Sequence, residues 1–443
     1  MNYPVPMHAP LLRQPDPAEI LAPLGLPLTP AVSAFARDLA PADDDRLEEM
    51  ARRSRAMTRR HFGRTVRLFA PLYLSNECIN SCSYCGFSRE NAILRVTLEA
   101  GQVRAEARHL AAQGFRNILL VAGEHPKFVS NGYLEKVLRT LAPEIPSLSI
   151  EVAPLEAPDY LPLVRAGAEG LVVYQETYHR PTYARIHVAG PKKDYDWRLA
   201  CPERGHAAGF RRIGIGVLFG LWDWREEAIA LAAHLDHLLR TCWKAHFTVS
   251  FPRLRPAAGD FQPAHPINDR DFVQLLCAFR LHFPRTGIVL STREPAALRD
   301  AVAPLGITMM SAGSHTEPGG YTGLGHDNLH LTVRGRAMAC DTPDGALATE
   351  QFSISDQRTP QEVAAQLRDL GLEPVWKDWD QAILATCIFT STAKNAGWTP
   401  RTWRHWSRNS AFLLPRLWSN TTVPHSSARS GSRPSCKIET ASK

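Results

Sequence analysis

The sequence lacks the features of membrane-spanning and exported proteins. No apolar run approaches the roughly eighteen residues that a helix needs to cross a bilayer. The first part of the chain contains no basic start followed by an apolar stretch, which is the pattern of a signal peptide. We therefore expect a soluble, cytoplasmic protein.

Cysteine is scarce, and its number and spacing exclude two common uses. Nine cysteines occur in 443 residues, and no second C-x2-C pair is present. A disulfide framework is not expected at this density and odd number, and a structural zinc site usually takes four ligands from two separated pairs. Six cysteines are isolated in the sequence: Cys201, Cys242, Cys277, Cys340, Cys387 and Cys436.

A basic excess is missing from most of the chain, although the net charge is +7. Residues 385–443 hold nine Lys and Arg and one acid, whereas residues 1–384 hold 42 basic and 43 acidic residues. A basic tail could bind nucleic acid or a membrane surface. Its Ser, Thr, Arg and Trp content, with little apolar periodicity, instead predicts a disordered, solvated extension.

The three remaining cysteines, Cys78, Cys82 and Cys85, form a C-x3-C-x2-C motif after an apolar, strand-like run. Three thiolates on one tight loop can hold three corners of a 4Fe-4S cube and leave one iron open. The amino and carboxylate groups of S-adenosyl-L-methionine can both bind that iron. An electron delivered through the cluster then yields a 5′-deoxyadenosyl radical, so the cofactors carry the difficult chemistry.

Short β-rich runs alternate with helical patterns over much of the chain, which indicates βα units and a parallel sheet. Eight such units predict a closed (β/α)8 TIM-type barrel with its active site at the carboxyl ends of the strands. The predicted strands are Arg67–Ser75, Asn117–Ala122, Leu148–Ala153, Gly170–Gln175, Arg212–Leu218, Phe247–Phe251, Gly287–Ser291 and Ile307–Ser311. The predicted helices are Leu98–Gln113, Tyr133–Leu141, Pro158–Ala166, Trp197–Ala208, Arg225–Arg240, Asp269–His282, Glu294–Ala303 and Pro360–Leu370.

We expect three regions along the chain. Residues 1–66 form an N-terminal extension, helical from about residue 43, which we expect to cap the barrel. Residues 67–384 form the barrel, and residues 385–443 form the basic tail.

Polar and charged groups recur at the ends of the predicted strands, where a barrel would bring them together. Each one alone has an ordinary alternative. An Arg after a strand could pair with a structural carboxylate, and a Gly-x-Gly could serve close helix–sheet packing. The segments are Gly123–His125, Glu151–Pro154, Tyr174–Tyr178, Gly214–Gly220, Ser250–Arg255, Ser291–Glu294 and Ser311–Ser314.

The cysteine loop Asn76–Phe87 resembles that of radical S-adenosylmethionine (radical SAM) enzymes of the tyrosine lyase branch. The closing segment Pro374–Asp380 resembles the 2-iminoacetate synthases (ThiH) of thiamine thiazole biosynthesis. The resemblance covers about residues 30–384. Other segments that resemble this branch are Tyr174–His179, Gly190–Arg198, Ser291–Pro295, Ser311–Ser314 and Pro318–Tyr321.

This resemblance implies a reaction, its cofactors and its partners. The deoxyadenosyl radical would take a hydrogen from the amine of L-tyrosine, and the Cα–Cβ bond would break to give p-cresol and 2-iminoacetate (dehydroglycine). A thiazole synthase (ThiG) would receive the 2-iminoacetate. A flavodoxin-type electron donor would supply electrons.

The resemblance also implies roles for individual residues. Cys78, Cys82 and Cys85 would hold the cluster. Glu124 would meet the methionyl amino group and Glu151 the ribose, and Arg185 is the candidate for the methionyl carboxylate. Arg293 and Ser291 are candidates for gripping the tyrosine carboxylate, with Arg253 as a second candidate, because Arg matches carboxylate geometry. The residues expected to border the cofactor are Tyr84, Gly123, Gly214 and Gly216.

The chain departs from the pattern in two segments. Thr322–Thr349 is long and Gly/Asp-rich, and we expect a mobile surface insertion there. The tail from Ala385 resembles nothing in the family.

Three alternative functions stay open at this point. A hydrogenase maturase also splits tyrosine but makes carbon monoxide and cyanide, and it needs a second cluster domain. The tail offers only Cys387 and Cys436 for such a domain. A related lyase could act on another aromatic amino acid, such as tryptophan. A non-catalytic barrel with a nucleic-acid-binding tail is disfavoured by the intact cysteine motif.

Overall fold

The computed structural model describes residues 16–338 and 345–376. The chain divides into two units, Met1–Ile383 and Leu384–Lys443, and the second lies outside the described residues. The predicted tail at 385–443 and the end of the Pro374–Asp380 segment therefore also lie outside them. None of the described helices combines the length and apolar character that a bilayer crossing requires.

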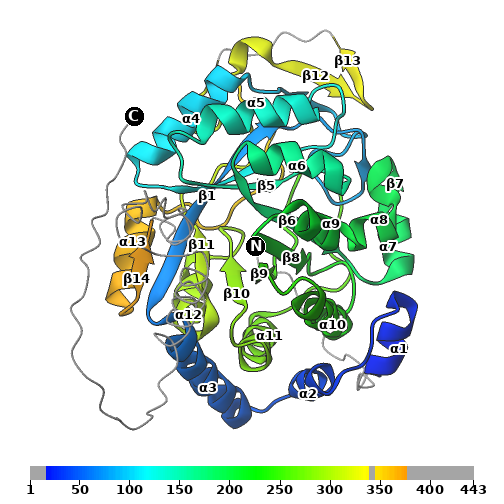
Figure 1. The fold of residues 1–443 in the computed structure, drawn as a ribbon, viewed down its shortest axis with the longest axis vertical. Coiled ribbons are helices and arrows are strands. Elements are labelled where there is room, and N and C mark those ends of the chain that lie inside the picture. Colours follow the sequence, from blue (N-terminus) through cyan, green and yellow to red (C-terminus); the bar gives the residue numbers. More distant parts are fainter. Residues whose placement is uncertain (1–15, 339–344, 377–443) are drawn as a thin grey trace, which may run out of the picture. The chain divides into compact units, whose positions relative to one another are not determined.

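Eight parallel strands form the centre of the first unit (Figure 1), and all eight correspond to predicted strands. Pairing of Arg67–Phe69 in β1 with Met309–Ser311 in β11 closes the sheet into a barrel. The predicted (β/α)8 fold is therefore confirmed. The strands are β1 (Thr65–Ser75), β4 (Asn117–Ala122), β5 (Ser147–Glu151), β6 (Ala168–Glu176), β8 (Arg212–Val217), β9 (His246–Ser250), β10 (Gly287–Leu290) and β11 (Met309–Ser311).

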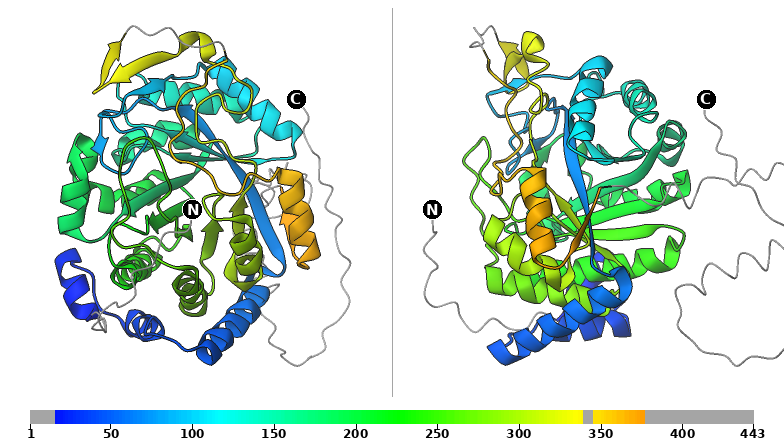
Figure 2. Two further views of the ribbon diagram at one scale, coloured as in Figure 1. Left: turned by 180° about the vertical axis from the view of Figure 1, so that it is seen from behind. Right: turned by 90° about the vertical axis from the view of Figure 1, so that its left-hand side faces the viewer.

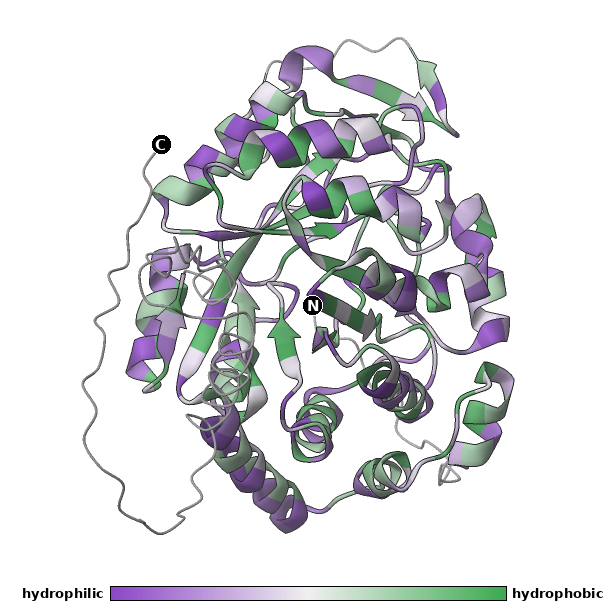
Figure 3. Ribbon diagram, viewed as in Figure 1, coloured by the Kyte–Doolittle hydropathy of each residue, from purple (hydrophilic) through white to green (hydrophobic). Residues whose placement is uncertain are grey.

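Helices surround the barrel and cover the outer faces of its strands (Figure 2). Strands buried on both faces are largely apolar, and in Figure 3 the central strands are mostly green while the outer helices carry purple faces. The predicted helix Trp197–Ala208 is two helices, because Pro202 starts a new one. The outer helices are α4 (Ala100–Ala112), α5 (Asn131–Leu141), α6 (Ala157–Arg165), α8 (Tyr195–Leu199), α9 (Cys201–Ala208), α10 (Trp224–Thr241), α11 (Asp269–His282), α12 (Ala296–Gly306) and α13 (Pro360–Asp369).

The N-terminal extension is helical from an earlier point than predicted. Besides α3 (Asp44–Phe62), which matches the prediction, it contains α1 (Pro17–Leu21), a short 3-10 turn η1 (Ala22–Leu24) and α2 (Pro30–Asp38). These helices pack on the outside of the barrel against α10, α11 and α12. The Ser54 hydroxyl, for example, donates to the Leu305 carbonyl at 2.6 Å. The extension therefore lies against the barrel wall.

The described part of the predicted insertion is tied to the barrel. Its strand β12 (His330–Val333) pairs antiparallel with β13 (Arg336–Met338) and with β3 (Ile93–Arg95). The Thr349 amide donates to the Leu94 carbonyl at 2.9 Å. These residues extend a small sheet beside the cysteine loop, and the mobility expected of the surface insertion stays a prediction. The last strand, β14 (Glu373–Val375), pairs with the start of β1.

Candidate active site

The three predicted cluster cysteines lie together on the loop that follows β1, at the carboxyl end of the barrel. Cys82 is 4% exposed and belongs to β2 (Ser81–Cys82), which pairs antiparallel with β7 (His187–Ala189). Cys78 and Cys85 are half-buried, and none of the three forms a disulfide. Burial raises the pKa of the Cys82 and Cys85 thiols, and nearby Lys192 opposes this shift.

Arg95 in β3 donates hydrogen bonds to the backbone of the cysteine loop. Its side chain is 1% exposed, and its guanidinium donates to the carbonyls of Asn76, Phe87 (3.0 Å) and Ser88 (2.8 Å). The Nε atom donates to the Thr332 hydroxyl in β12 at 2.5 Å. One buried arginine therefore joins both ends of the loop to the insertion. Sequence reasoning did not identify it.

Two amide side chains also fix the loop. The Asn91 amide donates to the carbonyls of Cys85 (3.1 Å) and Ala258 (3.0 Å), which ties the loop to the segment after β9. The Gln351 amide lies 3.8 Å from the Cys85 sulfur, and the Tyr73 hydroxyl donates to Gln351 at 2.7 Å.

The predicted residues Gly123 and Glu124 follow β4 and contact the cysteine loop. A Cβ atom on Gly123 would lie 2.3 Å from the Glu77 carbonyl oxygen, so glycine is needed for the close approach of two backbone segments. A Glu124 carboxylate oxygen accepts a hydrogen bond from the Asn80 amide at 2.6 Å. The same amide lies 3.7 Å from the Cys78 sulfur. Glu124 is therefore placed at the edge of the cysteine motif.

Glu151, at the end of β5, is half-buried and lies near other charges. Burial and the neighbouring Glu176 raise its pKa to about 7, while Arg293, Arg198 and Lys192 act in the opposite direction. The group can therefore change its charge within the physiological pH range.

A buried cluster of charged side chains lies next to the cysteine loop. Sequence analysis named its members only within longer segments and gave them no role of their own. Lys192 lies 2.7 Å from the Glu176 carboxylate, and Arg198 lies 3.5 Å from the same oxygen. The Lys192 ammonium also lies 5.6 Å from the centre of the Tyr84 ring. Glu176 has φ of 71°, a conformation that non-glycine residues seldom adopt and that clusters at functional sites.

The two predicted substrate arginines have different surroundings. Arg253 forms ion pairs with Asp269 at 2.7 Å and with Glu294. Arg293 has no ion pair with any carboxylate in the described residues; its guanidinium stacks on the Phe352 ring at 3.3 Å. The ordinary alternative, a structural partner for a carboxylate, therefore fits Arg253. The Arg293 guanidinium makes one long hydrogen bond, to the Arg253 carbonyl at 3.5 Å, and no described carboxylate neutralises its charge.

Ser291, predicted to bind the substrate, and two of the predicted cofactor residues, Tyr84 and Arg185, make the following contacts. The Ser291 hydroxyl lies 3.4 Å from the Arg293 amide nitrogen, which donates to it. The Tyr84 hydroxyl bonds the His187 ring at 3.0 Å, and Arg185 is exposed and donates to the Thr182 hydroxyl at 3.2 Å.

The glycines of β8 lie against side chains of neighbouring strands. A Cβ atom on Gly216 would lie 2.7 Å from the Tyr174 ring, and one on Gly214 would lie 3.1 Å from the Thr248 hydroxyl. Both glycines are thus explained by packing inside the barrel, the ordinary alternative for a Gly-x-Gly. Their role toward a cofactor stays a prediction.

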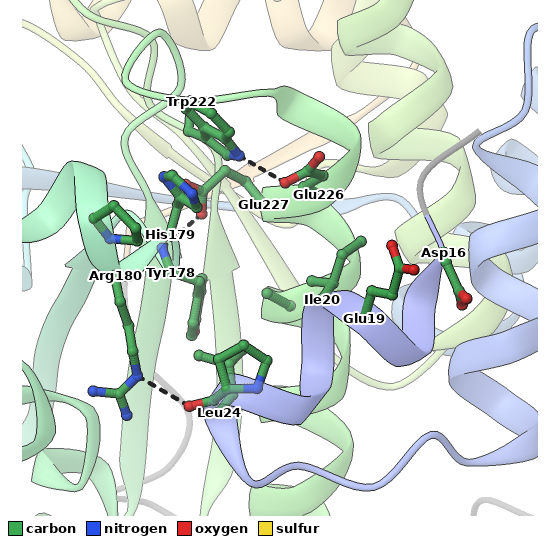
Figure 4. Close-up of a pocket in the computed structure, with 13 residues that line it drawn as sticks. Asp16, Glu19, Ile20, Leu24, Tyr178, His179, Arg180, Trp222, Glu226 and Glu227 are labelled. Atoms are coloured by element: carbon green, nitrogen blue, oxygen red, sulfur yellow. Dashed lines mark hydrogen bonds between the residues drawn. The ribbon is translucent and has the colours of Figure 1, made fainter. Parts of the chain in front are cut away.

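A cavity of about 500 Å³ lies away from the cysteine loop, between α1, α7 (Arg180–Ile186) and α10 (Figure 4). The His179 ring stacks on Trp222 at 3.7 Å, and the Trp222 indole donates to Glu226 at 2.7 Å. Tyr178 of the predicted strand-end segments lines it, but none of the residues expected to hold the cluster, the cofactor or the substrate does. This cavity is therefore separate from the candidate active site.

Comparisons with known proteins identify the family. Residues 72–232 match the radical SAM superfamily, and residues 250–373 match the biotin and thiamin synthesis associated domain. The chain is 44% identical to 2-iminoacetate synthase of Escherichia coli over 343 residues, which is 77% of this chain and 85% of that protein. The chain belongs to the 2-iminoacetate synthase family. The Salmonella typhimurium member of this family is 43% identical over the same shares.

A solved structure with a similar fold comes from a more distant protein. HydG, a maturase of the FeFe-hydrogenase, superposes with a TM-score of 0.72 at 32% identity. The superposition covers 85% of this chain and 79% of HydG.

Membership of the radical SAM superfamily implies a 4Fe-4S cluster and S-adenosylmethionine. The donor set fits such a cluster, because three free thiols lie on one loop whose backbone carbonyls accept hydrogen bonds from Arg95 and Asn91. No three His, Cys, Asp or Glu in the described part of the chain are arranged to hold a single metal ion. A four-iron cube is larger than one ion, so the cluster assignment rests on the cysteine spacing and on the family.

Proposed function

We propose that this chain is a radical SAM lyase that cleaves the Cα–Cβ bond of L-tyrosine to 2-iminoacetate and p-cresol, for thiazole formation in thiamine biosynthesis. The observation that carries the proposal is the braced cysteine loop at the carboxyl end of the barrel, in a chain 44% identical to a 2-iminoacetate synthase. A cysteine loop at this end of a barrel lies where such enzymes carry their chemistry.

In this proposal Cys78, Cys82 and Cys85 hold the cluster. Bound S-adenosylmethionine would supply radical chemistry at this site, namely removal of a hydrogen atom from the substrate amine. Glu124 orients the methionyl amino group as a hydrogen-bond acceptor. Glu151, in its ionised form, accepts hydrogen bonds from the ribose hydroxyls.

The substrate carboxylate is assigned to Arg293, with Ser291 beside it. Arg293 is supported over Arg253 because Asp269 and Glu294 already occupy the Arg253 guanidinium. Arg185, Tyr84, Gly123, Gly214 and Gly216 keep supporting roles around the cofactor, and Arg185 is the weakest of these because it is exposed.

We extend the proposal to partners and regions. A thiazole synthase (ThiG) consumes the unstable 2-iminoacetate, and a flavodoxin-type donor in the cytoplasm reduces the cluster. Residues 1–66 form an extension, 67–384 the catalytic barrel and 385–443 a separate tail.

The product spectrum tests the function. The protein is purified without oxygen, its cluster is rebuilt, and S-adenosylmethionine, reductant and L-tyrosine are added. We expect p-cresol, 5′-deoxyadenosine and glyoxylate from hydrolysed 2-iminoacetate, without cyanide; a Cys82→Ala variant is the matched inactive control. Cyanide would instead assign the maturase reaction suggested by HydG, and deoxyadenosine without p-cresol would overturn tyrosine as the substrate.

A further inference from the structure

A cavity of about 390 Å³ opens where the loop after β9 meets the cysteine loop. Its lining includes Tyr84 of the cysteine loop and Arg255 and Phe261 of the loop after β9. The Tyr84 and Phe261 rings meet edge to face at 6.2 Å. Because Tyr84 directly precedes Cys85, this cavity borders the cluster site.

The backbone around Arg255 is anchored on both sides. The Leu254 amide donates to the Phe219 carbonyl at 2.9 Å, and the Pro256 carbonyl accepts from the Ser353 amide at 2.8 Å. Three residues further on, the Ala258 carbonyl accepts from Asn91, which also bonds the Cys85 carbonyl. The position of Arg255 is therefore fixed relative to the cysteine loop.

The Arg255 side chain has no hydrogen bond or ion pair with any residue that the structure describes, and its Nε atom is buried without an acceptor. Burial of a charged donor without a partner is costly, so such a group invites an explanation. Two residues earlier, Arg253 is fully engaged with Asp269 and Glu294.

Arg255 is half-buried, and two fully buried arginines that also have an unpaired Nε atom, Arg280 and Arg299, differ from it. Arg280 donates through its terminal nitrogens to three carbonyls, and Arg299 pairs with Asp356. Their terminal nitrogens are thus bonded within the protein, although their Nε atoms are not. Arg255 combines an unpartnered guanidinium with a cavity at the cysteine loop, and the planar fork of arginine matches a carboxylate.

We propose that Arg255 binds a carboxylate group in this cavity through a two-point pair. The inference rests on the proposed function, which brings the carboxylates of two α-amino acid groups to this end of the barrel. One is the carboxylate of the tyrosine substrate, and the other is the methionyl carboxylate of S-adenosylmethionine. Arg255 is then a second carboxylate-binding arginine, in addition to Arg293.

Binding measurements on the full chain with its rebuilt cluster test this role without relying on turnover. Anaerobic calorimetry measures the affinities of L-tyrosine and S-adenosyl-L-homocysteine, and of tyramine and decarboxylated S-adenosylhomocysteine, which lack the carboxylate. We expect Arg255→Gln to weaken one carboxylate-bearing probe about tenfold or more, and its decarboxylated analogue little. Arg53→Gln, an exposed arginine on α3, is the matched control.

The pattern of losses distinguishes the two sources. Weaker tyrosine binding alone assigns Arg255 to the substrate, and weaker S-adenosylhomocysteine binding alone assigns it to the methionyl group. Unchanged affinity for both probes would overturn the proposal, as would equal losses for a probe and its decarboxylated analogue.

A second variant covers the case in which Arg255→Gln loses its cluster or unfolds. Arg255→Lys keeps the charge but not the fork, and we expect an intermediate affinity for the same probe. Wild-type affinity in this variant would contradict two-point binding. Failure of the wild-type chain to bind tyrosine would contradict the proposed function, and the S-adenosylhomocysteine measurement would still test Arg255.

Discussion

The ammonium group of Lys192 lies 2.7 Å from a Glu176 carboxylate oxygen, and both side chains are less than one-fifth exposed. Arg198 shares the same oxygen at 3.5 Å. Burial alone would raise the pKa of Glu176, but the two cations bring it down to about 2. The carboxylate therefore stays ionised, and its contribution to stability is present above its ordinary pKa of 4.5 and lost as pH falls toward 2.

We predict that Glu176→Gln strongly destabilises the protein. The substitution leaves Lys192 and Arg198 buried without their counter-charge, a change that typically costs about 3–5 kcal/mol. Urea unfolding followed by circular dichroism measures it. The control is Glu135→Gln, which breaks an exposed pair with Arg139 on α5 and should cost less than about 1 kcal/mol. Equal effects of the two substitutions would contradict a structural role for the buried cluster.

Arg95→Met should impair cluster assembly as well as stability. The substitution removes donors from carbonyls at both ends of the cysteine loop, and each buried carbonyl left unpaired costs about 1–3 kcal/mol. Arg280→Met is the matched control, because Arg280 also bonds three carbonyls, those of Pro284, Thr286 and Gly306, away from the cysteine loop.

The measurement for this pair is iron and sulfide bound per chain after anaerobic reconstitution, together with the melting temperature. We expect both variants to melt earlier and only Arg95→Met to lose iron. Iron loss in both would mean that general instability, and not the loop, determines cluster binding.

The barrel could be predicted from the sequence because each strand is a short segment whose apolar pattern is visible locally. β4, for example, runs from Asn117 to Ala122 as predicted, since a strand buried on both faces is a continuous apolar run. The pairing of β12 with β3 was missed because it joins distant segments; Thr332 and Arg95 are 237 positions apart. No pattern within a local window reports such a contact.

The same distinction holds in the candidate site. Cys78, Cys82 and Cys85 could be predicted as cluster ligands because all three lie within one short segment. Arg95 and Asn91 donate hydrogen bonds to backbone carbonyls. Every residue has a carbonyl, so the sequence does not show which residues accept these bonds. The pairing of Arg253 with Glu294 could not be predicted either, because the two residues lie 41 positions apart in the sequence.

Gly123→Ala should displace the cysteine loop. A methyl group there would meet the Glu77 carbonyl oxygen at 2.3 Å and Cys78 Cβ at 3.3 Å, and backbone cannot yield as a flexible side chain can. We expect lower cluster content and a lower melting temperature. Gly101→Ala is the control, because nothing lies within 4 Å of a methyl group at that position in α4 and alanine favours a helix by roughly 1 kcal/mol. A Gly123→Ala protein with a full cluster would contradict the close contact.

Substitutions of Arg293 and Arg253 should have different effects, the first on substrate binding and the second on stability. Arg293→Lys is expected to raise the KM for tyrosine about tenfold or more, because lysine loses the two-point geometry. Arg253→Lys should leave KM near the wild-type value and lower the melting temperature, because it weakens the pairs with Asp269 and Glu294. Steady-state p-cresol formation and thermal unfolding measure the two effects. The opposite assignment would return the substrate role to Arg253.

Glu151 should make cofactor binding depend on pH. Its raised pKa, about 7, means that the carboxyl group is largely neutral at pH 6 and ionised at pH 8, and the ionised form is the stronger acceptor for ribose hydroxyls. The affinity for S-adenosylhomocysteine should therefore rise about tenfold from pH 6 to pH 8, with proton release on binding below pH 7. The sign of the stability effect is the reverse, because a raised carboxyl pKa lowers stability as pH rises from 4.5 to 7.

Calorimetry in two buffers of different ionisation enthalpy measures both the affinity and the proton release. Glu151→Gln should abolish the pH dependence. Glu227→Gln is the matched control, because burial also raises the pKa of Glu227 to about 7, but its carboxylate accepts from Thr177 and Tyr178 beside the separate cavity at α10. We expect that control to keep the wild-type pH profile. An unchanged profile in Glu151→Gln, or its loss in Glu227→Gln, would remove Glu151 from the ribose site.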